Sequence, residues 1–211
     1  AGGARIQEIV ELCRRSGVPV RFESREVLER MTGKAVHQGV VAVGAAQGYR
    51  RLEEVAPEAR LLVLLDGVED PHNLGAIIRT ANGAGAGGVC IPERRSAGLT
   101  EAAAKAAAGA LEYTPVVRIG NVSQTLERLK KSGFWIYGLD ERGTVTYDQV
   151  EFFEPAVLVF GGEGRGLHQH VRERCDFLVR IPLAGQIPSL NVSVAAGVIL
   201  FEWKRRRQAT I

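Results

Sequence analysis

The stretch Leu61–Thr80, LLVLLDGVEDPHNLGAIIRT, sets the architecture of the chain. Its first five residues, Leu61–Leu65, are all apolar, which is typical of a parallel strand covered on both faces. A short polar turn follows, and Leu74–Ala84 then has apolar residues at helical spacing. A buried strand followed at once by a helix is the unit that repeats in α/β proteins.

The same alternation continues toward the C-terminus. Further strands are expected at Gly88–Ile91, Val116–Ile119, Trp135–Leu139, Ala156–Phe160 and Phe177–Ile181. Further helices are expected at Leu99–Ala108, Val122–Lys131, His168–Arg174 and Val192–Arg206. This order predicts a doubly wound parallel α/β sheet over residues 60–211. In such sheets the functional residues gather beyond the carboxyl ends of the strands.

Residues 1–45 have a weaker pattern. The expected runs are a helix over Ile6–Cys13, a strand over Val18–Phe22, a helical turn over Arg25–Met31 and a strand over Gly39–Val43. These runs are too few to bury a core, and the first residue is Ala rather than Met. We therefore expect the later part of a small α/β domain whose beginning is absent. Residues 46–59 have no clear apolar face, and we interpret them as a linker.

The composition is that of a soluble globular protein. Of the 211 residues, 45% are hydrophobic and 24% are charged, which excludes an intrinsically disordered chain. No window approaches the roughly 18 apolar residues that a membrane helix needs, so we expect no membrane partner and no secretory signal. The cysteines, Cys13, Cys90 and Cys175, are far apart and form no CxxC pair. They predict neither a disulfide framework nor a zinc site, and they indicate a reducing, cytoplasmic location.

The positive charge is concentrated near the start of the chain. Residues 1–52 carry nine basic against five acidic residues, a net charge of +4, whereas residues 53–211 carry eighteen against nineteen, a net charge of −1. Of the 27 basic residues, 22 are Arg, whose planar fork matches phosphates and stacks on bases. This pattern indicates a module that faces nucleic acid. A GC-rich genome together with a solvated helix face is the alternative explanation.

A first polar cluster, Asp66–Gly75, follows the first strand, and Arg79 lies six residues beyond Asn73. Asn73 is placed to cap the helix, because its side chain can accept a hydrogen bond from a free backbone N–H. Taken alone, the cluster is equally explained by a capped helix in which Arg79 pairs with Asp66 or Asp70.

A second cluster, Gly161–Leu167 (GGEGRGL), follows the strand Ala156–Phe160. Four glycines in six residues indicate a sharp turn or a close approach of a ligand to the backbone. The turn is no Walker A loop, since no Gly-Lys-Ser/Thr follows, and its glycine spacing excludes the dinucleotide fingerprint. Glu163 is the informative residue within it.

A third cluster, Pro182–Ser193, contains Ser189 and Asn191 near the start of the last helix. Either residue could be a simple N-cap. A Ser189 nucleophile finds no support, because no Gly-x-Ser-x-Gly elbow surrounds it and no histidine is an evident general base. The four histidines are His37, His72, His168 and His170.

Together the three clusters resemble the SpoU, or TrmH-like, family of RNA ribose 2′-O-methyltransferases. The first family motif, with its Asn-x-Gly-x-x-x-Arg-Thr core, is similar to Asp70–Thr80, and the second is similar to Val159–Leu167. The third is similar to Ile181–Pro182 followed by Ser189–Ser193. The stretches His37–Ala42 and Gly109–Glu112 are similar to the branch that methylates a guanosine of large-subunit ribosomal RNA.

The resemblance implies a fold and a set of partners. Residues 60–211 would form a knotted (trefoil) doubly wound parallel sheet, and residues 1–45 would be part of an L30e-like α/β RNA-binding domain. Enzymes of this family are homodimers that use S-adenosyl-L-methionine, and their chemistry requires no metal. The expected activity is therefore S-adenosylmethionine-dependent 2′-O-methylation of a ribose, that of a guanosine in 23S ribosomal RNA.

The resemblance also assigns site residues. The catalytic candidates are Arg79, Asn73, Glu163, Ser189 and Asn191. The candidates for binding the cofactor, largely through backbone, are Leu139, Gly161, Glu163, Ile181 and Leu190. A guanidinium keeps its proton at any working pH. We therefore expect Arg79 to grip an RNA phosphate and stabilise the developing alkoxide, with Asn73 and Ser189 orienting it.

Two alternatives stay open. The same chemistry on tRNA would use every one of these motifs, although the L30e-like segment favours ribosomal RNA. A non-catalytic, RNA-binding ribosome assembly factor would keep the fold alone. The presence of all five catalytic candidates favours an enzyme.

Overall fold

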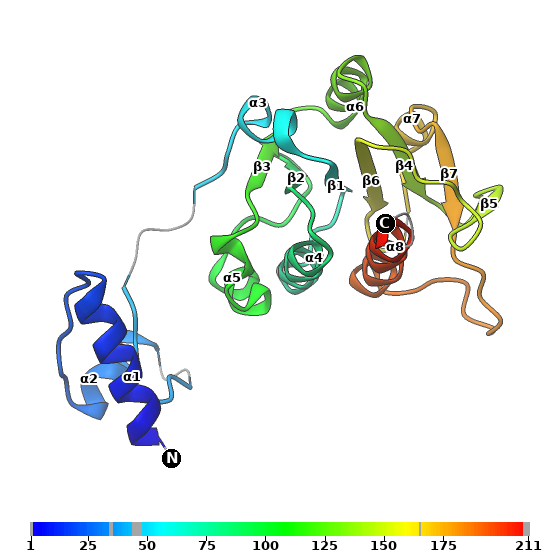
Figure 1. The fold of residues 1–211 in the computed structure, drawn as a ribbon. Coiled ribbons are helices and arrows are strands. Elements are labelled where there is room, and N and C mark those ends of the chain that lie inside the picture. The colour runs from blue at the N-terminus through cyan, green and yellow to red at the C-terminus, as the bar shows by residue number, and fades with distance from the viewer. Residues whose placement is uncertain (1, 34–35, 44–47, 165, 209–211) are drawn as a thin grey trace. The chain divides into compact units, whose positions relative to one another are not determined.

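The computed structural model describes residues 2–33, 36–43, 48–164 and 166–208. The chain divides into two compact units, Ala1–Ala46 and Gln47–Ile211 (Figure 1). The second unit begins before the predicted domain at residue 60, which leaves the division into domains a proposal.

The described residues of the N-terminal unit form two helices, α1 (Gly2–Arg15) and α2 (Arg25–Met31). Both were expected from the sequence, and the hydroxyl of Ser24 caps α2 by accepting a hydrogen bond of 3.4 Å from the Val27 N–H. The described residues of this unit contain no strand. The strand predictions at Val18–Phe22 and Gly39–Val43 are therefore wrong.

The two predicted strands do not form because the described part of this unit offers them no strand to pair with. A strand needs a neighbouring strand to pair its backbone N–H and C=O groups. In the described part of this unit neither segment pairs with another, and Phe22 and Val43 are 76% and 83% exposed. The apolar residues of these two segments therefore have no sheet to cover within the unit.

The second unit is built on a seven-stranded sheet in which every pairing is parallel. Its strands are β1 (Leu61–Asp66), β2 (Gly88–Pro92), β3 (Val116–Ile119), β4 (Trp135–Leu139), β5 (Val145–Thr146), β6 (Ala156–Gly161) and β7 (Phe177–Arg180). The spatial order is β3-β2-β1-β6-β4-β7-β5. The predicted parallel sheet is confirmed, and the knot stays a prediction.

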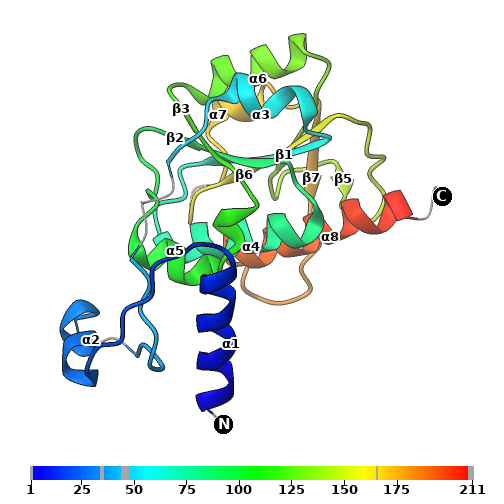
Figure 2. The same ribbon diagram turned by 60° about the vertical axis from the view of Figure 1, so that its left-hand side comes forward.

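Helices cover both faces of this sheet (Figure 2). They are α3 (Leu52–Val55), α4 (Pro71–Ala84), α5 (Glu101–Ala107), α6 (Val122–Lys131), α7 (Gln169–Arg172) and α8 (Val192–Gln208). On one face α4, α5 and α8 bury a core that includes Ile77, Ala103 and Ile199. On the other face α3, α6 and α7 bury Leu52, Leu126 and Val171.

Two elements differ from the sequence prediction. Helix α3 lies within the predicted linker 46–59, and its residues Leu52 and Val55 are buried in the core under α6. The linker interpretation therefore fails for these residues, because one helical turn with two apolar residues is too short to show a periodicity. Strand β5 was missed for the same reason, since it has only two residues.

The insertion of β6 between β1 and β4 gathers distant segments at one edge. Asp66 at the end of β1 is in register with Gly161 at the end of β6, and Leu139 at the end of β4 is in register with Phe160. The loops that follow these strands therefore lie together, at the carboxyl ends where ligands of α/β sheets bind.

Candidate active site

A cavity of about 680 Å³ opens beyond the carboxyl ends of β4, β6 and β7. Its volume is typical of a small-molecule site. All the residues that the family resemblance assigns to the cofactor line it: Leu139, Gly161, Glu163, Ile181 and Leu190. The start of the loop after β4, the glycine loop after β6, the loop after β7 and the start of α8 together form its walls.

The glycine loop, Gly161–Leu167, leaves no room for a side chain at its first two positions. A Cβ on Gly161 would lie 2.0 Å from the carbonyl carbon of Gly166, and a Cβ on Gly162 would lie 2.1 Å from the carbonyl oxygen of Gly67. The loop also closes on itself, because the Gly166 N–H donates to the Gly162 carbonyl at 3.1 Å. The packing of the loop therefore requires glycine at both positions, and Gly161 and Gly162 line the cavity as backbone alone, which suits a ligand bound by peptide groups.

Three of the predicted catalytic residues form one hydrogen-bonded network. The amide nitrogen of Asn73 donates to Glu163 Oε1 at 2.7 Å, and the amide nitrogen of Asn191 donates to Asn73 Oδ1 at 3.0 Å. Asn73 is buried, whereas Glu163 and Asn191 are exposed and line the cavity. The network therefore joins the three sequence clusters at the rim of the cavity.

Helix capping at this edge differs from the prediction for α4. The cap of α4 is Asp70, whose carboxylate accepts from the His72 N–H at 2.8 Å, with Pro71 as the first helical residue. Asn73 is therefore not the cap, and its side chain is free for the network. A carboxylate before Pro at the first helical position is a stronger start signal than an amide two residues inside the helix.

Asn191 caps α8 and also contacts Asn73, while its catalytic role stays a prediction. Its Oδ1 accepts hydrogen bonds from the N–H groups of Ser193 at 2.9 Å and Val194 at 3.4 Å, as an N-cap of α8 does. The same oxygen also accepts from the Ser193 hydroxyl at 2.6 Å. Capping fixes the side chain, and its amide nitrogen then reaches Asn73.

Arg79 and Ser189 are not part of this network. Arg79 is exposed, and among the described residues it makes no ion pair or hydrogen bond, so the alternative pairing with Asp66 or Asp70 is absent there. Six residues along a helix turn Arg79 about 120° away from Asn73. Ser189 is exposed and lines the cavity. Neither Asn73 nor Ser189 therefore orients Arg79 within the described chain.

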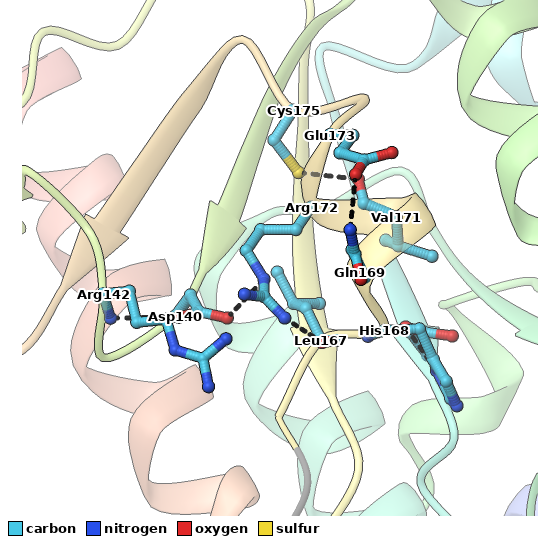
Figure 3. Close-up of polar contacts among 10 residues, drawn as sticks. Asp140, Arg142, Leu167, His168, Gln169, Val171, Arg172, Glu173 and Cys175 are labelled. Carbon is cyan, nitrogen blue, oxygen red and sulfur yellow. Dashed lines mark hydrogen bonds and ion pairs between the residues drawn. The ribbon is translucent and has the colours of Figure 1, made fainter.

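Two carboxylates that were not among the predicted site residues flank the glycine loop. Asp66 accepts from the backbone N–H of His168 at 3.0 Å and lies 2.9 Å from its ring Nδ1. Asp140, which follows β4 and lines the cavity, forms an ion pair of 3.2 Å with Arg172 (Figure 3). Their position in the sequence could have identified them, since each carboxylate ends or directly follows a buried strand.

The two thiols of the second unit are not available as nucleophiles. Burial raises the pKa of the Cys90 and Cys175 thiols to about 12, which excludes both as thiolate nucleophiles at working pH. In the described ranges no group of three or more His, Cys, Asp or Glu side chains could hold a metal ion. No helix within those ranges is long and apolar enough to cross a membrane.

Comparison with known proteins gives the chain relatives over both units. The model of the SpoU rRNA Methylase family matches residues 60–201, and the model described as RNA 2′-O ribose methyltransferase substrate binding matches residues 1–50. The 23S rRNA (guanosine-2′-O-)-methyltransferase RlmB of Pseudomonas aeruginosa is 44% identical over 209 residues, which covers 96% of this chain and 84% of that protein.

Solved structures agree with this assignment. The AdoMet-bound rRNA methyltransferase of Sinorhizobium meliloti superposes with a TM-score of 0.82 at 29% identity, and covers 97% of this chain and 78% of its own. The A. aeolicus TrmH/SpoU tRNA modifying enzyme superposes with a TM-score of 0.66 at 30% identity, but covers only 75% of this chain and 83% of its own. The two family models match residues 60–201 and residues 1–50, and the three sequence motifs lie at one edge of the parallel sheet. The chain therefore belongs to the SpoU rRNA Methylase family.

Proposed function

We propose that this protein transfers a methyl group from S-adenosyl-L-methionine to the 2′-hydroxyl of a guanosine ribose in 23S ribosomal RNA. The observation that carries the proposal is the Asn73–Glu163–Asn191 network, which joins residues 90 and 118 positions apart at the rim of one cavity. Relatives that match both units include 23S rRNA (guanosine-2′-O-)-methyltransferases and an rRNA methyltransferase of known structure, beside others named tRNA/rRNA methyltransferases.

The cavity suits S-adenosylmethionine on its own geometry. Gly161 and Gly162 leave peptide groups exposed where a side chain would clash, and the volume of about 680 Å³ accepts a ligand of nucleoside size with an amino-acid tail. Leu139, Ile181 and Leu190 would hold it with backbone and apolar contacts. When bound, this cofactor supplies an electrophilic methyl group on a sulfonium.

The chain's own residues would act on the acceptor ribose. The hydroxyl must lose its proton while charge develops on its oxygen, and preorganised donors stabilise such charge. Asn73 and Glu163 would fix the position of the ribose at the cavity rim, with Asn191 holding Asn73. Arg79 would bind the adjacent phosphate, because the planar fork of a guanidinium matches the geometry of phosphate oxygens. Ser189 would contact the ribose from the loop before α8.

The proposal extends to the assembly and location of the protein. Val194 and Phe201 are seven residues apart on one face of α8, and they are 52% and 49% exposed. Large apolar side chains gathered on one helix face mark an interface, which supports a homodimer. The described cysteines are free, which is consistent with the cytoplasm.

Transfer of radiolabelled methyl from S-adenosylmethionine tests the function directly. We expect label in unmodified 23S ribosomal RNA, at a single guanosine 2′-oxygen, and none in tRNA. Glu163→Ala should lower turnover by about 10²-fold, the scale for removing one preorganised polar group from a site. Glu173→Ala is the matched control, since Glu173 accepts a hydrogen bond from Gln169 on α7 and lies outside the cavity.

The outcomes separate the competing functions. Label in tRNA alone would establish the tRNA alternative. Binding of 23S ribosomal RNA without any transfer, by protein that binds S-adenosylhomocysteine poorly, would establish the assembly-factor alternative. Equal turnover in Glu163→Ala and Glu173→Ala would remove Glu163 from the site.

A further inference from the structure

The glycine loop is held between two carboxylates, one at each neighbouring strand. Strand β6, which leads into the loop, lies between β1 and β4. Asp66 ends β1 and Asp140 follows β4, and the side chain of each is only 6% exposed. Both carboxylates therefore sit beside the loop, one on each flank, in surroundings where an unpaired charge would be costly.

Asp66 fixes His168, the residue that directly follows the loop. Its Oδ2 accepts the backbone N–H of His168 at 3.0 Å and lies 2.9 Å from the ring Nδ1 of the same residue. Two contacts to one oxygen determine both the backbone position and the ring orientation of His168. The Gly162 side of the loop is fixed next to it, because Gly162 packs directly on the Gly67 carbonyl.

Asp140 fixes the other flank through Arg172. Arg172 forms an ion pair of 3.2 Å with Asp140 Oδ2, and its Nη2 donates to the Leu167 carbonyl at 3.2 Å (Figure 3). The other oxygen of Asp140 accepts the Arg142 N–H at 3.0 Å. One guanidinium therefore connects the loop after β4 with the last residue of the glycine loop.

Gly138 makes this connection possible. A Cβ on Gly138 in β4 would lie 2.5 Å from the Cys175 sulfur and 2.8 Å from Leu167 Cδ1. The absence of a side chain lets the α7 segment lie against β4, which brings Arg172 within reach of Asp140. His168 and Arg172 hold the loop from the α7 face of the sheet, whereas Asn73, itself bonded to Asn191, meets Glu163 from the opposite face.

We infer that Asp66–His168 and Asp140–Arg172 are positioning pairs, which hold the glycine loop so that its backbone receives the methyl donor and its Glu163 meets Asn73. The inference rests on the proposed function. A buried ion pair such as Asp140–Arg172 contributes little net stability compared with apolar packing, so stability alone does not account for it at this place. A displaced loop would disturb donor and acceptor together, and a shift of about 1 Å in a reacting group can cost about 10²-fold in rate.

His168→Leu is the sharpest test, because His168 does not line the cavity. Any loss of affinity for S-adenosylhomocysteine must then pass through the loop. We expect calorimetry to show affinity at least about tenfold weaker, and hydrogen exchange to show faster exchange of the loop amides after Gly161. His168→Asn, which keeps an N–H donor close to the position of Nδ1, should restore most of the affinity.

His170→Leu is the matched control. His170 shares the ring contact of 5.5 Å with His168, but the described structure gives it no bond to Asp66. This variant should bind S-adenosylhomocysteine as the wild type does. On the other flank, Arg172→Met should weaken binding, Arg172→Lys should weaken it less, and Arg174→Met should leave it unchanged, since Arg174 pairs with the exposed Glu127.

The results distinguish failure of this inference from failure of the proposed function. Wild-type protein that does not bind S-adenosylhomocysteine contradicts the proposed function itself. Wild-type binding together with unchanged affinity and unchanged amide exchange in His168→Leu and Arg172→Met overturns the positioning role. Should either variant not fold, His168→Ala and Arg172→Lys take their places, and affinity in both equal to that of His170→Leu would overturn the inference.

Discussion

Replacing Asn73 by Asp changes one atom type at the centre of the site network. In the wild type the Asn73 amide nitrogen donates to Glu163 Oε1 at 2.7 Å. In Asn73→Asp a carboxylate oxygen takes the place of that nitrogen, so that two carboxylates face each other. The hydrogen bond to a charged acceptor is lost and a repulsion replaces it.

The size of the effect follows from the distance. Two unit charges 2.7 Å apart repel by about 1.5 kcal/mol in the dielectric of water and by about 6 kcal/mol at an effective dielectric constant of 20. Glu163 is exposed and Asn73 is buried, which places the pair between these limits and nearer the first. We expect a loss of about 2 to 3 kcal/mol in the free energy of unfolding at pH 8, in line with the loss of a charged hydrogen bond.

The loss should depend on pH. Two carboxylates sharing one site raise the pKa of one of them, because a single proton removes the repulsion. A group whose pKa is raised by folding binds its proton in the folded state first, so stability increases as the pH falls through the raised value. The stability deficit of Asn73→Asp relative to the wild type should therefore shrink by more than half between pH 8 and pH 5.

Thermal unfolding measures this, with Asn82→Asp as the control. Asn82 also lies on α4, and its amide nitrogen donates to the neutral hydroxyl of Thr114 at 3.0 Å. We expect Asn73→Asp to lower Tm by roughly 4–12 °C at pH 8, since about 1 kcal/mol corresponds to 2–4 °C at this size. Asn82→Asp should show a deficit that is the same at both pH values. A deficit of Asn73→Asp that does not change with pH would refute the assignment of a shared site.

Three further predictions concern the donor, Arg79 and the assembly. S-adenosylhomocysteine should bind with the same affinity in the presence and absence of EDTA, and affinity that depends on added metal would contradict donor binding by backbone and apolar groups. Arg79→Ala should lower turnover by about 10²–10³-fold with Tm within about 1 °C, because this exposed side chain has no partner in the described structure, whereas Arg94→Ala should change neither. Sedimentation should give about 46 kDa, twice the chain mass of 22.8 kDa, and Phe201→Asp should shift it toward the monomer. A wild-type monomer at micromolar concentration would contradict the dimer.

The fold could be predicted where apolar runs were long. Leu61–Leu65 is fully buried between two helical layers, and such a run has no other stable environment in a chain of this size. The predicted bounds of the helix Val122–Lys131 are confirmed, and in the structure the side chain of Asn121 caps it. The prediction of two strands in the N-terminal unit was wrong because a strand forms only beside a partner strand, and the sequence of one segment does not specify that partner.

The sequence identified candidate residues for the site, but it could not show which of these residues are in contact. The motifs singled out Asn73, Glu163 and Asn191, but nothing in their spacing indicates that Asn73 connects the other two. That contact depends on β6 lying beside β1, and strand order is a property of tertiary packing. The pairs Asp66–His168 and Asp140–Arg172 could not be predicted either, because each connects residues that become neighbours only through the same strand order.

The proposed reaction requires both binding of the methyl donor and positioning of the acceptor ribose, and different residues of one loop would perform these two tasks. A methyl donor bound by peptide groups needs backbone without side chains, which Gly161 and Gly162 provide. Positioning an acceptor ribose needs fixed polar side chains, which Glu163 provides one residue later, braced by Asn73. Because one short loop would perform both tasks, an error in its position would affect both at once. Buried contacts on both of its flanks are consequently what this arrangement requires, and the two carboxylates at the neighbouring strand ends supply them.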